Sequence, residues 1–600
     1  MCGVAAIYSY HYAAEDIERS ELRAIRDRMQ SRGPDDDGEW YSEDNRVGLG
    51  HRRLSIIDLS KQAAQPMTSQ CGRYVISYNG EIYNYKSLRA GLESAGTRFA
   101  TDSDTEVVLE MFRRYGTDMF NHLRGMYALA IWDTLERRML LARDPFGIKP
   151  LYYADDGWTC RVASQVKALR AIGQISDDPE PAGHVGFLLF GSVPEPFTLW
   201  REIRAVPAGT YVWVDRSGIG APRKYFDLPS LYECDSARST DDSLSEAIED
   251  SVRHHMVADV PVGAFLSSGL DSSVLVAMMS KCATTPIKTV TVGFEEFRGT
   301  SADEVPLAEE VASAFNTQHT TRLVSREEFE QDLPKILHAM DQPTIDGINV
   351  WFASKACAEI GLKVAVSGLG GDEISAGYPT FRVLPNWYRK TRFAGKIPGL
   401  GSMLRGILAP LRPLTGINAK AVGMLEYGGS LAGLYLLKRG LFMPWELPDL
   451  VGRELAREGL KRLDPLENLE RSGYRNADTP GARISVLEQS CYMRNQLLRD
   501  ADWASMAHSL EVRVPFVDPV LQRQVFRHGR PTSKAEIAKV SSLLPKAMLT
   551  RQKSGFETPV ENWISKCGIE SKTPKATEHW SRRWARSINQ HFGDGCAFSH

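Results

Sequence analysis

The sequence predicts an α+β layered domain followed by an α/β domain with a helical C-terminal extension. Over roughly the first 200 residues, short strand patterns alternate with only two helical patterns, which favours a layered domain over a doubly wound one. From residue 244, helix and strand patterns alternate as in a parallel sheet covered by helices. From about residue 395 the periodicity is mostly helical. We therefore expect domains at residues 2–215 and 240–600.

The elements of the N-terminal domain are predicted from apolar runs that end at turn residues. In chain order these runs predict strand 2–8, helix 15–29, strands 46–57 and 73–84, helix 104–115, and strands 126–133 and 137–144. Asn79 with Gly80, and the segment 144–147, carry turn residues. We therefore expect turns at both places.

A polar stretch without periodicity, residues 216–243, is predicted as a linker between the domains. The elements predicted after it are helix 244–256, strand 260–266, helix 272–282 and strand 288–294. Near the C-terminus, residues 577–592 predict an amphipathic helix that packs on a neighbouring element.

The composition indicates small molecules as partners. Charged residues make up 24% of the chain and the formal net charge is -3, so nothing favours nucleic acid as a ligand. No run of about 20 apolar residues is present to span a bilayer. Nine cysteines without a CxxC pair argue against a disulfide framework or a zinc ribbon. We expect a cytoplasmic protein that binds neither membranes nor nucleic acid.

The loop Ser267 to Ser273, SSGLDSS, joins a predicted strand to a predicted helix. Backbone N–H groups and hydroxyls at such a helix N-terminus favour an anion. Asp271 would oppose a bare phosphate, but beside Mg²⁺ its carboxylate becomes a ligand. The chain has no GxxxxGK[ST] segment, which excludes the ordinary P-loop. The alternative is a serine-rich turn that caps a helix.

This loop resembles the pyrophosphate loop of the asparagine synthetase family. The family's SGxGxDExxxGY motif is similar to KVAVSGLGGDEISAGYPTF, which contains Asp372. Two further similar segments are RDADWASMAHSLEVRVPFVD and RQKSGFETPVENW. Two such turns at the ends of neighbouring strands would hold ATP and metal in one crevice.

The resemblance implies that ATP, as a substrate, adenylates a carboxylate, and that ammonia then captures the adenylate as an amide. Mg²⁺ would be shared by Asp271 and Asp372. The implied ATP and pyrophosphate contacts are Ser267, Gly269, Asp271, Ser272, Ser273, Val292, Ser367 and Gly368. Lys534 falls about where the family places a lysine that neutralises the adenylate. Lys539 is the other candidate for that role. For each of the two, an ordinary surface lysine is the alternative interpretation.

Cys2 directly follows the initiator methionine. If Met1 is removed, the α-amine of Cys2 can act as base for its own thiol, which then attacks the amide of glutamine. The segments MCGVAAI, SRGPDD, HRRLSIID, NGEIYN and TDSDTE are similar to the class II glutamine amidotransferase domain, an N-terminal-nucleophile (Ntn) hydrolase with αββα layers. The implied donor of ammonia is therefore glutamine.

By the same resemblance, Arg53 and Asp104 bind the α-carboxylate and α-amino group of glutamine, and Glu81 helps to hold the amino acid. Asn79 and Gly80 form the oxyanion hole. A guanidinium suits a carboxylate, and an amide N–H beside a glycine N–H suits an oxyanion. The alternatives are a hairpin turn at Asn79 and a solvent-facing Arg53.

The acceptor substrate stays open because the chain departs from the family pattern. Members that make asparagine carry an acid where this chain has Leu369, and leucine cannot take a proton. Gln342 and Ser268 are further departures. Aspartate is the default acceptor and another carboxylate is the alternative. The β-lactam synthetases share the fold but lack the cysteine, and a non-catalytic glutamine- and nucleotide-binding protein would have damaged motifs. Family likeness implies an ammonia tunnel and a possible homodimer.

Overall fold

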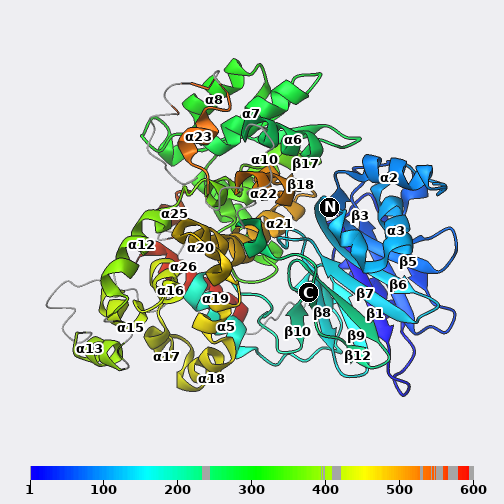
Figure 1. Ribbon diagram of the computed structural model, residues 1–600, viewed down its shortest axis with the longest axis horizontal. Coiled ribbons are helices and arrows are strands. Elements are labelled where there is room, and N and C mark those ends of the chain that lie inside the picture. Colours follow the sequence, from blue (N-terminus) through cyan, green and yellow to red (C-terminus); the bar gives the residue numbers. More distant parts are fainter. Residues whose placement is uncertain are drawn as a thin grey trace.

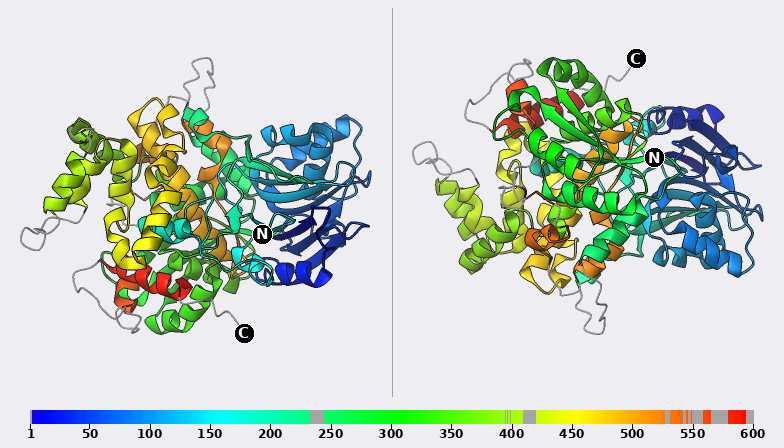
Figure 2. Two further views of the ribbon diagram at one scale, coloured as in Figure 1. Left: turned by 90° about the horizontal axis from the view of Figure 1, so that it is seen from below. Right: turned by 90° about the horizontal axis from the view of Figure 1, so that it is seen from above.

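The structure is a computed structural model, and its two domains lie side by side (Figure 1). The described residues are 2–232, 244–393, 395, 397, 399–408, 420–526, 531–541, 544, 545, 548, 558–564 and 579–593. The N-terminal domain lies at one end of the long axis and the helices around α13 lie at the other (Figure 2). The α/β domain lies between them.

The N-terminal domain contains two antiparallel sheets, as the predicted fold class requires. The first sheet has the order β10 (Ile203–Ala205), β8 (Tyr152–Asp155), β9 (Thr159–Ala163), β1 (Gly3–Ser9), β3 (Val47–Arg53) and β2 (Asp36–Tyr41). The second has the order β12 (Gly218–Ile219), β11 (Thr210–Asp215), β7 (Arg138–Arg143), β6 (Gly125–Asp133), β5 (Tyr74–Ile82) and β4 (Met67–Thr68), and β13 (Arg223–Lys224) pairs with β11. Part of the predicted linker, 218–224, therefore adds two short strands, and 233–243 lies outside the described residues.

Apolar residues from the facing sides of the two sheets form a shared core, and helices cover the outer sides. The core includes Val4 of β1 and Trp132 of β6. The helices of this domain are α1 (Arg19–Asp27), α2 (Tyr85–Ser94), α3 (Asp104–Tyr115), α4 (Val166–Leu169) and α5 (Pro181–Phe190). Because α1 packs on β1 and β3 while α3 packs on β5, the layers are α, β, β and α. The predicted Ntn-hydrolase layering is confirmed.

Two local predictions for this domain were wrong. Asn79 and Gly80 do not form a turn but lie inside β5, opposite Ala128 and Tyr127 of β6. The long-range ladder with β6 overrides the turn preference of the pair. Helix α1 begins at Arg19 and not at residue 15, because the N–H of Ile17 donates to the Asn45 carbonyl and holds the preceding segment extended.

The C-terminal domain is built on a five-stranded parallel sheet. Its order is β16 (Gln318–Val324), β15 (Lys288–Phe294), β14 (Val262–Phe265), β17 (Val364–Val366) and β18 (Glu511–Arg513). Every neighbouring pair is parallel. The last strand was not predicted, because it has only three residues and its partner, β17, precedes it by more than a hundred residues. The predicted α/β domain is confirmed.

Helices surround this sheet and form the extension. They are α6 (Leu244–His255), α7 (Leu270–Cys282), α8 (Val305–Ala314), α9 (Arg326–Ala339), α10 (Ile348–Glu359), α11 (Gly371–Ile374), α12 (Thr380–Thr391), α13 (Leu400–Leu408), α15 (Met424–Tyr427), α16 (Leu431–Arg439), α17 (Pro448–Val451), α18 (Arg453–Leu463), α19 (Pro465–Glu470), α20 (Pro480–Leu487), the π-helix η9 (Glu488–Leu498), α21 (Arg499–Met506), α22 (Pro519–Val525), α23 (Lys534–Ala538), α25 (Val560–Ile564) and α26 (Trp580–Gly593). As predicted, α26 is amphipathic: it buries Trp584 and packs on α5. No helix among the described residues is long and apolar enough to cross a membrane.

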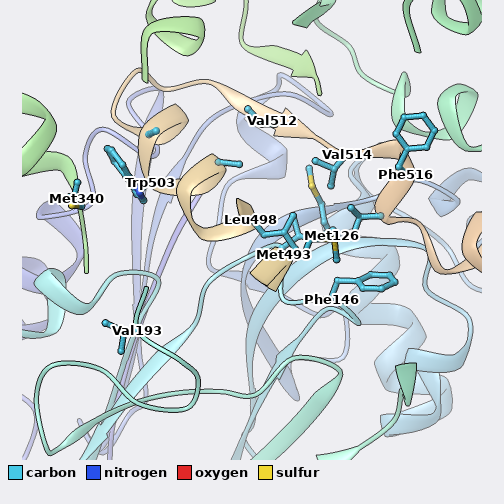
Figure 3. Close-up of a cluster of buried hydrophobic side chains, with 14 of the residues drawn as sticks. Met126, Phe146, Val193, Met340, Met493, Leu498, Trp503, Val512, Val514 and Phe516 are labelled. Atoms are coloured by element: carbon cyan, nitrogen blue, oxygen red, sulfur yellow. The ribbon is translucent and has the colours of Figure 1, made fainter. Parts of the chain in front are cut away.

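A buried apolar cluster joins the two domains (Figure 3). Met126, Phe146 and Val193 enter it from the N-terminal domain. Residues of η9, α21, β18 and the turn after β18 enter it from the C-terminal domain: Met493, Leu498, Trp503, Val512, Val514 and Phe516. The two predicted sites therefore lie in domains that share one continuous core.

Candidate active sites

Cys2 lies directly before β1 and is 8% exposed. Its backbone N–H donates to Oδ1 of Asn79 at 2.9 Å, and its Sγ lies 4.0 Å from the Leu54 carbonyl oxygen. Burial raises the pKa of the Cys2 thiol, because the thiolate would be poorly solvated. A buried thiol of this kind needs a base, and the nitrogen of the same residue is held beside Asn79.

Asn79 is fully buried in β5, and only one end of its side-chain amide makes a hydrogen bond among the described residues. Its Oδ1 is used by Cys2, while its Nδ2 has no hydrogen-bond partner among the described residues. A buried amide N–H without a partner is costly unless a ligand satisfies it. Gly80 follows, and a Cβ at that position would lie 2.3 Å from the Met126 carbonyl oxygen. Only glycine fits there.

Arg53 and Asp104 are both buried in the N-terminal domain. The Arg53 guanidinium donates to the Ser60 carbonyl at 2.9 Å and to the Asp58 carbonyl, so the solvent-facing alternative for Arg53 was wrong. Asp104 begins α3 and accepts hydrogen bonds from the Tyr78 hydroxyl and the Ile82 N–H, both at 3.0 Å. Burial raises the pKa of Asp104 to about 6, although these hydrogen bonds oppose the shift.

Glu81 contacts the other domain. Its Oε2 lies 3.7 Å from Nη2 of Arg513 on β18, and Arg513 donates through Nε to Glu511 at 2.7 Å. Burial, together with the charges of Glu511 and Asp104, raises the pKa of Glu81 well above its usual range. The roles of Glu511 and Arg513 were missed by the sequence reasoning. The signal was their place in the segment SLEVRVPFVD, which was quoted only as a family match.

Arg32 is a second contact between the domains that was missed. It is fully buried, donates through Nε to the Cys2 carbonyl at 3.0 Å, and forms two hydrogen bonds to Asp502 of α21, at 2.7 and 2.9 Å. The bidentate geometry fixes the guanidinium plane. The backbone of the nucleophile is thus tied to the C-terminal domain.

In the C-terminal domain, the loop between β14 and α7 is folded by its own serines. Ser267 Oγ lies 3.0 Å from Ser272 Oγ and accepts the Gly269 N–H at 3.1 Å. Ser273 donates to the Gly269 carbonyl at 2.9 Å. The N-terminus of α7 therefore opens at the carboxyl end of the sheet, where an anion is favoured. Val292 lies buried on β15, the neighbouring strand.

The second predicted turn, which includes Ser367 and Gly368, follows β17 and touches this loop. A Cβ on Gly368 would lie 2.9 Å from the Ser272 nitrogen, and one on Gly371 would lie 2.4 Å from the Asp271 carboxyl carbon. These glycines therefore let the two turns approach each other. The structure brings the predicted ATP-binding segments together at the ends of adjacent strands.

Asp271 and Asp372 converge on the Lys534 ammonium, which lies 2.9 Å from Asp372 Oδ1 and also pairs with Asp271. The ammonium stands where a cation fits, so the donor set suits Mg²⁺. Among the described residues no third His, Cys, Asp or Glu completes a metal cluster, so phosphate oxygens and water would supply the other ligands. Burial lowers the pKa of Lys534, but the two carboxylates outweigh burial and raise it. Lys539 is exposed.

The comparisons with known proteins fit both sites. A family model described as a glutamine amidotransferase domain matches residues 1–226, and one described as asparagine synthase matches residues 243–571. The chain belongs to the asparagine synthetase family. Glutamine-hydrolyzing asparagine synthetase 1 of Bacillus subtilis (strain 168) is 34% identical over 579 residues, 94% of this chain and 88% of that protein.

Two other relatives match over a smaller share of this chain. Asparagine synthetase B of Escherichia coli (strain K12) is 31% identical and covers 64% of this chain and 66% of its own. Amidase chry2 of Gibberella zeae is also 31% identical, over 64% of this chain and 60% of its own. A solved glutamine phosphoribosylpyrophosphate amidotransferase from B. subtilis is 15% identical with a TM-score of 0.31, covering 55% of this chain and 92% of that chain. Membership of the asparagine synthetase family supports glutamine-dependent amide synthesis over nucleotide sensing.

The family's acidic position is filled here by Leu369, which packs against the apolar core. Glu373 is an acid close by, fully buried, and its Oε1 accepts from the Tyr378 hydroxyl at 2.8 Å. Burial and the charge of Asp372 raise the pKa of Glu373 to about 7. Glu373 was quoted in the motif but given no role. The site thus keeps an acid, but not at position 369.

Proposed function

We propose that the chain hydrolyses glutamine at Cys2 and uses the ammonia, with ATP, to convert a carboxylate into an amide. The observation that carries this proposal is the pair of complementary sites in one folded unit. One site has a buried thiol beside the spare Nδ2 donor of Asn79, and the other has two carboxylates that converge on a cation.

In the glutaminase step, the α-amine of Cys2, freed by removal of Met1, takes the proton of the Cys2 thiol, and Sγ attacks the amide carbon of glutamine. Nδ2 of Asn79 and the N–H of Gly80 would stabilise the oxyanion. Ammonia leaves with the transferred proton, and water then hydrolyses the thioester to glutamate. Arg53, Glu81 and Asp104 would hold the amino acid.

In the synthetase step, the serines and backbone N–H groups of the loop 267–273 would bind the pyrophosphate of ATP. Mg²⁺, held by Asp271 and Asp372, would stabilise the negative charge of the phosphates. Lys534 would neutralise the adenylate, since its ammonium lies beside the two carboxylates that would hold the metal. Ser367, Gly368 and Val292 would complete the nucleotide site.

Ammonia would pass between the sites as a neutral molecule. The core that joins the domains is formed by Met126, Met493 and other apolar side chains (Figure 3). Apolar surroundings of this kind disfavour ammonium, because an ion loses its hydration there. Transfer through the protein would therefore deliver the nucleophilic form.

Aspartate, giving asparagine, is the default acceptor, since two of the relatives named above are asparagine synthetases. Leu369 favours a second candidate, a different carboxylate, because an acid that could act on ammonia or the tetrahedral intermediate is replaced by an apolar side chain. A homodimer, a cytoplasmic location and the absence of nucleic-acid partners are likewise proposals.

The test is release of AMP and pyrophosphate from Mg·ATP and glutamine, with and without aspartate, with asparagine assayed in the same tube. Aspartate-dependent AMP and asparagine would support the default. Glutamate release without aspartate-dependent AMP would support another acceptor. The absence of both glutamate release and AMP release would contradict the proposal. Cys2→Ala is the control for the glutamine-dependent signal.

A further inference from the structure

A cavity of about 1170 Å³ lies at the seam between the two domains. One wall comes from α1, the residues that follow it, and Lys167 of α4, and the other from α9, α10 and the end of α21. None of the described residues that line it belongs to either candidate active site. A cavity of this size, with polar and apolar walls, is large enough for a small organic ligand.

The acidic side chains in the lining already have basic partners. Asp332 accepts from Lys335 at 2.9 Å and from Lys355 at 2.6 Å. Glu359 accepts from Arg322, which lies outside the cavity, at 3.2 Å. Asp27, the remaining acid of the lining, pairs with Arg26 and Arg52. The acids of the lining therefore leave little negative charge for a ligand to meet.

Two cations of the lining, Arg28 and Lys167, are not paired with an acid of the lining. Arg28 is exposed, and its guanidinium has no hydrogen-bond or ion-pair partner among the described residues. Lys167 donates to the carbonyls of His338 and Ala339, at 3.0 and 2.8 Å, which are uncharged partners. Asp341 accepts the backbone N–H of Lys167 and offsets part of its charge, but it is not in the lining.

The two histidines of the cavity lining, His338 and His508, have lowered pKa values, mainly because of burial. Burial lowers the pKa of His338, and the charges of Lys167 and Arg28 lower it further. Burial and the charge of Lys355 lower the pKa of His508 to about 4. Both imidazoles are therefore neutral near pH 7, and the electrostatic field of the cavity favours an anion.

We propose that this seam cavity binds a small organic polyanion that carries carboxylate or phosphate groups. Arg28 and Lys167 would bind its charged groups, since charge-assisted hydrogen bonds to carboxylate and phosphate are strong. Ala24, Pro334 and Ala358 give the walls apolar surface for a carbon skeleton. The ligand would contact both domains and would therefore stabilise the contact between them.

The cavity borders the contacts that hold Cys2. Ser31 lines it and precedes Arg32, which donates to the Cys2 carbonyl. Ser509, next to the cavity residue His508, donates to the Ser31 carbonyl at 2.7 Å. A ligand in the cavity would therefore lie next to the contacts that hold the Cys2 backbone.

The test is isothermal titration of the full chain with two probes, citrate and inorganic phosphate. Arg28→Ala removes an uncompensated cation, and Ala358→Glu places a carboxylate in the lining. Each is expected to weaken binding about tenfold. Lys281→Ala, on the exposed face of α7, is the matched control and should bind like the unaltered chain. Unchanged glutamate release by both cavity variants would show that they fold.

The probes separate the two sources of negative charge. A loss of citrate affinity alone indicates a carboxylate ligand, and a loss of phosphate affinity alone indicates a phosphate ligand. A loss of affinity for both probes supports a site that accepts either anion. Phosphate bound at the loop 267–273 would be unaffected by either substitution. No binding of either probe up to about 10 mM, or equal affinity in both variants and the control, would overturn the proposal.

Discussion

Asn79 illustrates how a single side chain can serve both structure and chemistry. Its Oδ1 holds the nitrogen of Cys2, and this bond orients Nδ2, the donor left without a partner among the described residues. In the proposed mechanism, the two ends of one amide thus place the nucleophile and offer an oxyanion donor. The burial of the pair excludes water, which strengthens both interactions.

Asn79→Ala is expected to lower kcat for glutamate release about 100-fold, because one oxyanion donor is lost. AMP formation with added ammonium chloride should persist, since the C-terminal site is untouched. The measurement is the paired assay of glutamate and AMP. Asn386→Ala, an exposed amide on α12, is the control, and wild-type glutamate release by the Asn79 variant would contradict the assignment.

Glutamine binding is expected to weaken in acid because of Asp104. Its pKa is raised to about 6, so below pH 6 the carboxyl becomes neutral and no longer attracts an ammonium group. KM for glutamine should rise roughly tenfold between pH 7 and pH 5. The same raised pKa means that the ionised Asp104 carboxylate costs stability in the unliganded fold, and that protonation relieves this cost as pH falls through 6. In Asp104→Asn, KM should be high and insensitive to pH in this range; a KM that still varies with pH would assign the effect elsewhere.

Asp271→Asn is expected to abolish AMP formation while glutamate release persists. The substitution removes one of two converging charges and with it a ligand of a hard cation. Measurement of both products over a range of Mg²⁺ concentrations checks this. If AMP is formed at the unaltered rate and with the unaltered Mg²⁺ dependence, the metal assignment for Asp271 and Asp372 fails.

At the scale of elements, strand β5 positions the proposed oxyanion donors, Asn79 and Gly80, by passing close to β6. Gly80 lies opposite Tyr127, and the ladder leaves no room for a side chain. A turn at this point would have carried Asn79 away from Cys2. The element, and not the dipeptide, therefore decides where the donor lies.

Gly80→Ala is expected to destabilise the fold by about 1–3 kcal/mol, since its Cβ would meet backbone atoms of β6. Gly91→Ala is the matched control. Gly91 lies in helix α2, where a Cβ would have no described atom within 4 Å, and alanine there should stabilise by about 1 kcal/mol. Thermal unfolding of both variants measures the difference, and equal melting temperatures would argue against the close approach.

At the scale of the whole molecule, the C-terminal domain completes the N-terminal site. Asp502 holds Arg32 against the Cys2 carbonyl, and Arg513 lies beside Glu81. These ion pairs are buried, so removal of one partner leaves an uncompensated charge. Glutamine hydrolysis is thus expected to depend on residues of the C-terminal domain, far along the chain from the nucleophile.

Asp502→Ala is expected to lower glutaminase activity and to destabilise the protein by about 3–5 kcal/mol, because Arg32 stays buried without its partner. Lys363→Ala is the control. It breaks the exposed pair with Asp35, another contact between the domains at 2.8 Å, and should cost under about 1 kcal/mol. Glutamate release and unfolding by denaturant are the measurements, and equal effects of the two substitutions would show that the buried bridge has no special role.

The sequence by itself determined the local features. Helix 104–115 was predicted with the bounds of α3, because its apolar spacing is helical. In the structure Ser103 caps it. The anion loop at 267–273 was predicted because a strand, small residues and a helix follow one another in the chain. The family was also evident, since its motifs are short and contiguous.

Only the tertiary structure decided what depends on pairing between distant segments. It placed Asn79 and Gly80 inside a strand, added β18 to the parallel sheet, and brought Lys534, and not Lys539, to the two aspartates. It also joined Arg32 to Asp502. These contacts arise from ladders and ion pairs across tens to hundreds of residues, and local propensity carries no information about such partners.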